Sequence, residues 1–472
     1  MKTKFTLAVL SAALMVSACH DDDNNDGPVQ LPADTPPPAA EEAGMSYVRV
    51  THASADAPLV AIAVNGAVVE GLEMVDYQVG TGLLELESAA YDIAVNALLA
   101  DGTSAPVIEA NLDFAPDMQY DIIALNYAAN IEPVVLARDA MGPGDGEIRL
   151  DVLHGHPDVG AVDIYLTTAE SIDAEGAAIE GLEFKMDADA LPVTVPADTY
   201  RIRIAPSGTK TVVFDSGNLD LAGGSDLMIT AVPNTDGAMT APVNLLVGDG
   251  TSVGVLRDAN EQARVRVVHA VDDAPAVDVL ASDTPVEGLT MIPFKEFRSI
   301  DLPAASYDLK VAASMDNSIV AIDAPGVEFG AGTTTSIYAV GKLNSITDNT
   351  IEPLVIAEDL RSVALYAKLR VVHASPTAGS LGLVDIHASA DGNFSADTKV
   401  LEGVDFKGNA TLNVPAGTYY LGVILQSDDT FTPAVSAMAT VENGGVYSVV
   451  ATDDFDNGLL LNVDYMKMME EM

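Results

Sequence analysis

The sequence predicts an all-β protein made of four tandem immunoglobulin-like β-sandwich modules. One observation is a short apolar run that ends in a histidine and occurs four times, at His52, His154, His269 and His373. The copies are spaced by about 100 residues, which is the size of a small domain. A second observation is that strand-like runs of about four to seven residues are separated by Gly, Pro, Asn and Asp, without a sustained helical period. Repeated short strands of this kind are typical of two-sheet sandwiches.

Ahead of the repeats, residues 1–18 have the features of a bacterial lipoprotein signal peptide. A positively charged start precedes the apolar segment 5–16, and Val16-Ser17-Ala18-Cys19 matches a lipobox. Cys19 is the only cysteine in the chain, so it cannot form an internal disulfide, and we expect it to carry a lipid. The apolar segment is too short to cross a bilayer. The sequence therefore predicts a membrane anchor at Cys19.

The residues after the cysteine indicate the compartment. His20 follows Cys19, where an aspartate would favour retention in the inner membrane by resemblance to well-studied proteobacteria, so we expect an outer-membrane location in a bacterial envelope. Residues 19–45 form an acidic, Pro-rich tether that has too few apolar residues to fold by itself. Whether the modules face the periplasm or the cell exterior stays open.

Each module is expected to contain the same elements in the same order. The histidine strand is followed by a turn rich in Ala, Ser, Asp and Pro, a Val-Asp-Val type strand, a Glu-Gly turn and a Pro-Ala-x-x-Tyr turn. Module 1 departs from this pattern at the second strand, which reads Val60-Ala61-Ile62-Ala63, and has Tyr91 as the equivalent tyrosine. The tyrosines resemble the tyrosine corner of sandwich folds, so we expect them to be structural. They are Tyr91, Tyr200, Tyr307 and Tyr419. The predicted module boundaries are 46–140, 147–258, 263–360 and 367–466.

Together, the histidine strand, the Val-Asp-Val strand and the Pro-Ala-x-x-Tyr turn resemble the bacterial family catalogued as domain of unknown function 4397. The resemblance covers roughly residues 46–465 and is best in the third and fourth modules. It implies an exported, repeated β-sandwich. The family has no established activity, so the resemblance adds a fold and a compartment but no chemistry.

Composition excludes some classes of partner. The formal net charge is −48, which argues against nucleic acid, because phosphates need basic partners. Tryptophan is absent and aromatic residues make up 5% of the chain, which weakens a polysaccharide-binding interpretation, since sugar rings usually stack on aromatic side chains.

The repeated histidines are the most conspicuous candidate site. In modules 2 to 4 an aspartate follows on the next strand, at Asp163, Asp278 or Asp385, and a His–Asp contact could orient an imidazole for metal binding or base chemistry. Recurrence in every copy favours a structural role instead, because few proteins carry four identical active sites. The best transition-metal candidate is in module 2, where His154 and His156 are two residues apart on an expected strand and Asp163 follows.

Calcium is the cofactor that the sequence favours most. Acid-rich linkers at 138–147, 257–261 and 358–359 could bind ions between modules.

The sequence contains no nucleophile elbow, phosphate-binding loop or zinc signature. We therefore expect a non-enzymatic envelope lipoprotein, a stalk of β-sandwich modules that serves adhesion, protein contact or envelope structure. The alternative is a periplasmic module that binds a ligand or a metal, either calcium or a transition metal.

Overall fold

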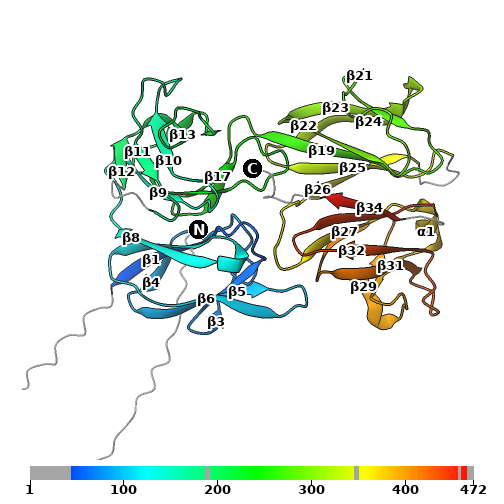
Figure 1. Cartoon of the computed structure of the whole chain (residues 1–472), viewed down its shortest axis with the longest axis horizontal. Helices are drawn as coiled ribbons and strands as arrows, with labels where there is room; N and C mark the ends of the chain where they lie inside the picture. Colours follow the sequence, from blue (N-terminus) through cyan, green and yellow to red (C-terminus); the bar gives the residue numbers. More distant parts are fainter. Residues whose placement is uncertain (1–43, 187–191, 345–349, 455–458, 465–472) are drawn as a thin grey trace, which may run out of the picture.

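The computed structural model describes residues 44–186, 192–344, 350–454 and 459–464, the last of these as backbone only. These residues form four β-sandwich modules, each with two sheets (Figure 1). The sheet that contains the histidine strand is called the first sheet below, and the other is called the second sheet. The signal peptide, Cys19 and most of the tether lie outside the described residues.

Module 1 has four strands in each sheet. The first sheet has the order β4-β1-β7-β8 and the second has the order β3-β2-β5-β6. The elements are β1 (Met45–His52), β2 (Val60–Val64), β3 (Ala67–Val68), β4 (Leu84–Glu87), β5 (Ala90–Leu98), β6 (Ser104–Asp113), β7 (Met118–Leu125), the 3-10 helix η1 (Ala128–Asn130) and β8 (Glu132–Asp139).

Module 2 has the same plan with extra edge strands. Its first sheet has the order β12-β9-β16-β17-β18, and its second has the order β11-β10-β13-β14 with β15 also paired to β13. The elements are β9 (Glu147–His154), β10 (Val162–Thr167), β11 (Ile179–Leu182), β12 (Val193–Pro196), β13 (Asp198–Pro206), β14 (Phe214–Asp215), β15 (Leu219–Leu221), β16 (Asp226–Pro233), β17 (Val243–Gly248) and β18 (Val253–Leu256).

Module 3 repeats the arrangement of module 1. Its sheets have the orders β22-β19-β25-β26 and β21-β20-β23-β24. The elements are β19 (Gln262–His269), β20 (Val277–Ala281), β21 (Thr284–Pro285), β22 (Phe297–Pro303), β23 (Ala305–Ala313), β24 (Asp316–Phe329), β25 (Thr334–Val340) and β26 (Glu352–Glu358).

Module 4 adds a short helix after its histidine strand. Its sheets have the orders β30-β27-β33-β34 and β29-β28-β31-β32. The elements are β27 (Ala367–His373), α1 (Pro376–Leu381), β28 (Val384–Ser389), the 3-10 helix η2 (Ala396–Thr398), β29 (Lys399–Val404), β30 (Asn409–Val414), β31 (Gly417–Leu425), β32 (Val435–Val441), β33 (Val446–Ala451) and β34 (Leu459–Asp464).

The histidine strand lies in the centre of every first sheet. It pairs antiparallel with one neighbour and parallel with the other, as β1 does with β4 and β7. Alternate residues of this strand, such as Val48 and Val50, point into the core of their own module. The remaining residues of the strand point to the opposite face of the first sheet.

That opposite face is not exposed to solvent, because the modules pack in pairs through their first sheets. Module 1 covers module 2 through an apolar cluster that includes Ile123, Leu125 and Leu246. Module 3 covers module 4 through a cluster that includes Val268 and Val372. Figure 1 shows the first pair on the left and the second pair on the right. We call each contact between two first sheets a pair joint.

The stalk expected from the tandem order did not specify how the modules contact one another, and here they pack face to face in pairs. Each histidine strand is buried on both sides, so a module separated from its partner would expose apolar surface to water. The burial of that surface favours face-to-face packing over an end-to-end chain.

Placing a charge in a pair joint should destabilise the protein. Val372 is fully buried in the second joint, so Val372→Asp buries a carboxylate without a partner, and we expect the free energy of unfolding to fall by roughly 3 kcal/mol or more. Urea titration of the full chain measures this loss. The matched control is Val355→Asp on β26, where the side chain is 52% exposed and the expected change is within about 0.5 kcal/mol. Equal effects of the two substitutions would contradict the buried joint.

Candidate functional site

The four repeat histidines are buried at the ends of their strands, and their ring nitrogens bond the backbone. In each module Nδ1 accepts a hydrogen bond from the backbone N–H two residues later, at 3.2 to 3.4 Å. In modules 1 to 3 Nε2 donates to a carbonyl oxygen six residues later, at 2.9 to 3.1 Å. In module 4 helix α1 replaces that loop, and within the described residues Nε2 of His373 has no partner. The rings therefore fix the turn after the histidine strand.

An aromatic ring stacks edge-on against each of these histidines, with ring centroids 6.2 to 6.4 Å apart. The aromatic residues are Tyr77, Phe184, Phe294 and Phe406. The residue after each ring has a positive φ of 65° to 70°, and its backbone N–H donates to the carbonyl oxygen of the histidine at 2.8 Å. Left-handed backbone is uncommon for residues other than glycine, so the surrounding contacts must stabilise it.

In three modules this left-handed residue is a lysine that crosses the pair joint. Lys185 pairs with Glu132 of module 1, and Lys407 pairs with Glu352 of module 3 at 2.9 Å. Lys295 of module 3 pairs with Asp454 of module 4. Each ammonium group also lies 5.2 to 5.7 Å from the centre of the preceding phenylalanine ring. The histidine, the aromatic ring and the lysine thus form one unit that links the two modules of a pair.

The aspartates of the Val-Asp-Val strands bond other groups than the histidines. Asp163 accepts from the backbone N–H groups of Gly181 and Gly208, both at 2.8 Å. Asp385 accepts from Gly403 at 2.8 Å, so both carboxylates hold the Glu-Gly turn. Burial alone would raise the pKa of Asp163, but these hydrogen bonds outweigh it and lower that pKa.

In module 3, Asp278 accepts from the backbone N–H of Met291 at 2.8 Å and from Oγ of Ser314 at 2.6 Å. Here too burial opposes the hydrogen bonds, and the net shift lowers the pKa of Asp278. The carboxylate fixes the loop that leads to Phe294, so its contribution to the histidine unit is indirect.

The histidines considered for a transition metal in module 2 use ring nitrogens for hydrogen bonds to the backbone. Both ring nitrogens of His154 are engaged as described, and Nδ1 of His156 accepts from the N–H of Asp158 at 3.2 Å. Across the residues that the structure describes, no three His, Cys, Asp or Glu side chains are grouped so that they could hold a metal ion.

The linker carboxylates considered for calcium also bond protein groups. Glu261 accepts from Oγ1 of Thr240 at 2.7 Å, and Asp359 pairs with Lys368. Calcium binding at these linkers stays a prediction.

The three tyrosines of the Pro-Ala-x-x-Tyr turns and their first-module equivalent make one shared contact. The hydroxyl groups of Tyr91, Tyr200, Tyr307 and Tyr419 each donate to the carbonyl oxygen four residues upstream, at 2.8 to 3.0 Å. Each bond closes the turn before a strand of the second sheet.

Buried arginines at the pair joints are the residues that sequence reasoning missed. Arg49 is 1% exposed and pairs with Asp121 at 2.6 Å. In the second pair, Glu358 accepts from Arg266 at 3.1 Å and from Arg370 at 3.0 Å. A signal was available, because the chain has only 22 Lys and Arg residues and yet has an arginine three residues before the repeat histidine in three of the four modules.

The two pair joints place opposite charges at equivalent positions. Arg138 near the end of β8 contacts Asp151 on β9. The equivalent residue of module 3 is Glu358 on β26, and the equivalent of Asp151 is Arg370 on β27. The cation and the anion are thus exchanged between the first joint and the second.

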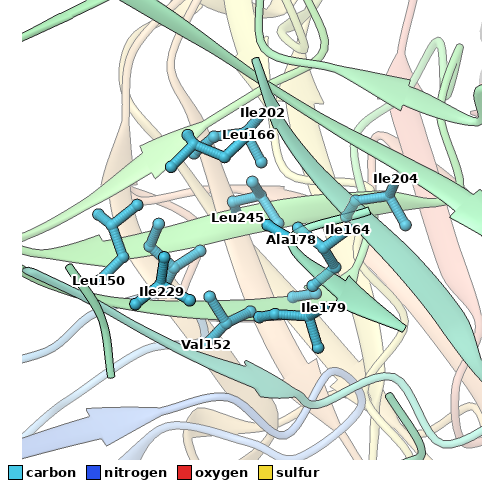
Figure 2. Close-up of a pocket in the computed structure, with 12 residues that line it drawn as sticks. Leu150, Val152, Ile164, Leu166, Ala178, Ile179, Ile202, Ile204, Ile229 and Leu245 are labelled. Carbon is cyan, nitrogen blue, oxygen red and sulfur yellow. The ribbon is translucent and has the colours of Figure 1, made fainter. Parts of the chain in front are cut away.

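The cavity in Figure 2 lies between the two sheets of module 2. Its volume is about 20 Å³, close to that of one water molecule, and its lining is apolar. It includes Val152, Ile229 and Leu245. A space of this size and polarity is a packing gap and is too small for an organic ligand.

Filling this gap should stabilise module 2. Val152→Ile adds one methylene beside the cavity, and we expect a gain of about 0.5 to 1 kcal/mol, measured as a higher Tm by calorimetry. The control is Val267→Ile at the equivalent position of module 3, which should be neutral or destabilising because Val267 is a fully buried core residue where an added methylene overpacks its neighbours. A lower Tm for Val152→Ile would show that the gap cannot accept the group.

The buried histidines should make stability pH-dependent. Burial lowers the pKa of His52, His156 and His373 to about 4, from an ordinary value of 6.5. Between pH 6.5 and 4 the unfolded chain binds more protons, so the stability present above pH 6.5 decreases as the pH falls through this range, by up to roughly 3 kcal/mol for each ring. Urea titrations from pH 7 to pH 4.5 measure the slope.

Replacing one ring tests the assignment. His52→Asn removes a titrating group, so the free energy of unfolding should depend less steeply on pH. Tyr91→Phe removes a hydrogen bond but no group that titrates in this range, so it should lower stability without changing the slope. A wild-type stability that is constant between pH 6.5 and 4.5 would contradict the neutral buried rings.

Solved structures give only distant similarity. The Bacillus anthracis TIE protein has 11% identity and a TM-score of 0.14, with 87% of this chain and 69% of that chain covered. A putative cell adhesion protein from Bacteroides uniformis has 13% identity and a TM-score of 0.19, with 46% and 99% covered. BcpA*(D312A), the major pilin subunit of Bacillus cereus, has 10% identity and a TM-score of 0.13, with 65% and 99% covered. TM-scores this low carry no argument about function.

No curated protein sequence matches the chain. The family model described as "Domain of unknown function (DUF4397)" matches at residues 46–165 and 263–384. Each match begins on the histidine strand of an odd-numbered module and extends into the next module, so each includes strands from both sides of a pair joint. The two matches cover more than half of the chain, and the protein therefore belongs to the DUF4397 family.

Proposed function

We propose that the protein is a non-enzymatic lipoprotein of the bacterial envelope, anchored through Cys19 to the outer membrane, and that its four modules form a rigid body for protein contact, adhesion or envelope structure. The observation that carries this proposal is that the residues repeated in each module make structural contacts. The histidine of each repeat bonds the backbone and the aromatic ring packs against it, and in modules 2 to 4 the following lysine pairs with the partner module. These contacts support assembly of the modules.

The placement of positive charge supports a role in contact with other molecules. Many of the described arginines and lysines lie at joints, as Arg266, Lys295 and Lys342 do between modules 3 and 4. Carboxylates therefore dominate the outer surface of a chain whose net charge is −48. Such a surface favours a basic protein partner and opposes direct contact with anionic headgroups.

The anchor is proposed from the sequence of residues 1–19. No helix among the described residues has the length and the apolar character of a membrane span.

Lipidation at Cys19 can be tested directly. Cells grown with radioactive palmitate should yield labelled wild-type protein in the membrane fraction, whereas Cys19→Ser should carry no label, because the thiol is the acylated group. Label retained by Cys19→Ser would refute the anchor.

Orientation is measured by protease treatment of intact cells that express the protein with a tag after Met472. Loss of the tag from intact cells would favour adhesion at the cell surface. A tag that survives until the cells are lysed would favour an envelope-structural role in the periplasm. Catalytic turnover that is abolished by a change at a repeat histidine would refute the non-enzymatic proposal.

A further inference from the structure

Module 1 departs from the other modules at the residue after the aromatic ring. Gln78 stands where modules 2, 3 and 4 have Lys185, Lys295 and Lys407, although its backbone keeps the same left-handed conformation. The side chain of Gln78 cannot supply the cation that lies over the ring in the other modules.

The linker between modules 3 and 4 supplies a cation instead. The guanidinium group of Arg361 lies over the Tyr77 ring, with 5.6 Å between its central carbon and the ring centre. The same tyrosine bonds module 2, because its hydroxyl donates to the carbonyl oxygen of Pro233 at 2.6 Å. Tyr77 is thus in contact with module 2 and with the linker of the second pair.

Arg361 occupies a buried site whose other walls belong to module 1. Its Nη1 donates to the carbonyl oxygens of Ala55 at 3.2 Å and Ala57 at 2.8 Å, and its Nη2 pairs with Asp76. The residue is 6% exposed. The linker backbone adds a bond from the N–H of Ala364 to the carbonyl oxygen of Asp56 at 2.8 Å.

The chemistry of this site suits a guanidinium group. Two carbonyl oxygens and one carboxylate accept from different N–H groups, while the flat face of the guanidinium lies against an aromatic ring. An ammonium group has fewer donors and no flat face, so lysine could not satisfy all of these contacts together.

We propose that module 1 carries a guanidinium-binding site, made of the carbonyls of Ala55 and Ala57, Asp76 and the Tyr77 ring, and that Arg361 binds there to hold the second pair against the first. Arg361 lies 285 residues from Asp76 in sequence. Because its linker leads directly into module 4, the contact joins both pairs into one compact body. The inference is independent of the proposed function.

The test uses the full mature chain and three variants. Arg361→Ala removes the guanidinium, Arg361→Lys keeps the charge, and Arg298→Ala is the matched control. Arg298 is an exposed arginine on β22 that pairs with Glu296 at 2.8 Å, so its removal changes the net charge equally and leaves the site intact. Small-angle X-ray scattering gives the radius of gyration, and a broad-specificity protease gives the rate of cleavage at residues 359–366.

Arg361→Ala should increase the radius of gyration and raise the rate of linker cleavage at least tenfold. Arg361→Lys should resemble Arg361→Ala more than wild type, and Arg298→Ala should match wild type. If Arg361→Ala is poorly folded by circular dichroism, Asp76→Asn removes the anionic wall from the module 1 side and should loosen the same contact.

Guanidinium ion itself is the probe for the binding site. Guanidinium chloride at low, non-denaturing concentration should slow linker cleavage in the Arg361→Ala variant, in which Asp76 is unchanged. Sodium chloride at equal ionic strength should not slow it. Adding Asp76→Asn to Arg361→Ala should abolish that protection. The proposal would be overturned if Arg361→Ala kept the wild-type radius of gyration and the wild-type rate of linker cleavage. It would also be overturned if sodium chloride slowed cleavage as much as guanidinium chloride does.

Discussion

The burial of arginine side chains at the pair joints is the constraint on which the rest of the structure depends. A buried guanidinium is strongly destabilising unless a carboxylate and further acceptors surround it. Arg266 meets this condition, because it bonds Ser336 and Ser448 besides pairing with Glu358. Arg49 pairs with Asp121 through Nε, while within the described residues its two Nη atoms have no acceptor. Both ion pairs form only when the strands of the first sheet are in register. Such pairs contribute little net stability compared with apolar packing, but they strongly disfavour arrangements that leave one partner alone.

The histidine units add a second layer of constraint to the same joints. A histidine ring fixes one turn, an aromatic ring packs against it, and the next residue takes a left-handed conformation that aims its side chain across the joint. In module 2 this side chain is Lys185, which reaches Glu132 of module 1. In module 1 the corresponding cation comes from a distant linker through Arg361. One local motif therefore connects modules within a pair and also connects the two pairs.

The fold of a single module could be predicted from sequence, because the short strands, their turn residues and the repeat are local patterns. The pairing of modules could not be predicted in this way. Arg49 occupies an alternating position that usually faces solvent, and only the partner sheet covers it. The expectation of a stalk did not include this pairing for the same reason, because the spacing of the repeats does not show which face of a sheet another module covers.

The candidate site was harder to infer for geometric reasons. The sequence spacing favours a contact between Asp163 and His154, but Asp163 lies on the second sheet and its carboxylate bonds Gly181 and Gly208. The left-handed lysines were not found, because glycine is the residue that normally marks this conformation. Arg361 and its site in module 1 are separated by most of the chain, a distance over which no local pattern carries information.

The exchange of charges between the two joints has a consequence for assembly. A chain of similar repeats can pair its modules in the wrong combination, which is a common way for repeat proteins to misfold. Module 1 against module 4 would bring Arg138 towards Arg370, and module 3 against module 2 would bring Glu358 towards Asp151. Like charges in a desolvated contact repel, so each mismatched combination is disfavoured while each correct one is attractive. The placement of the cation and the anion in this ion pair therefore favours the pairing of each module with its own partner over a mismatched pairing.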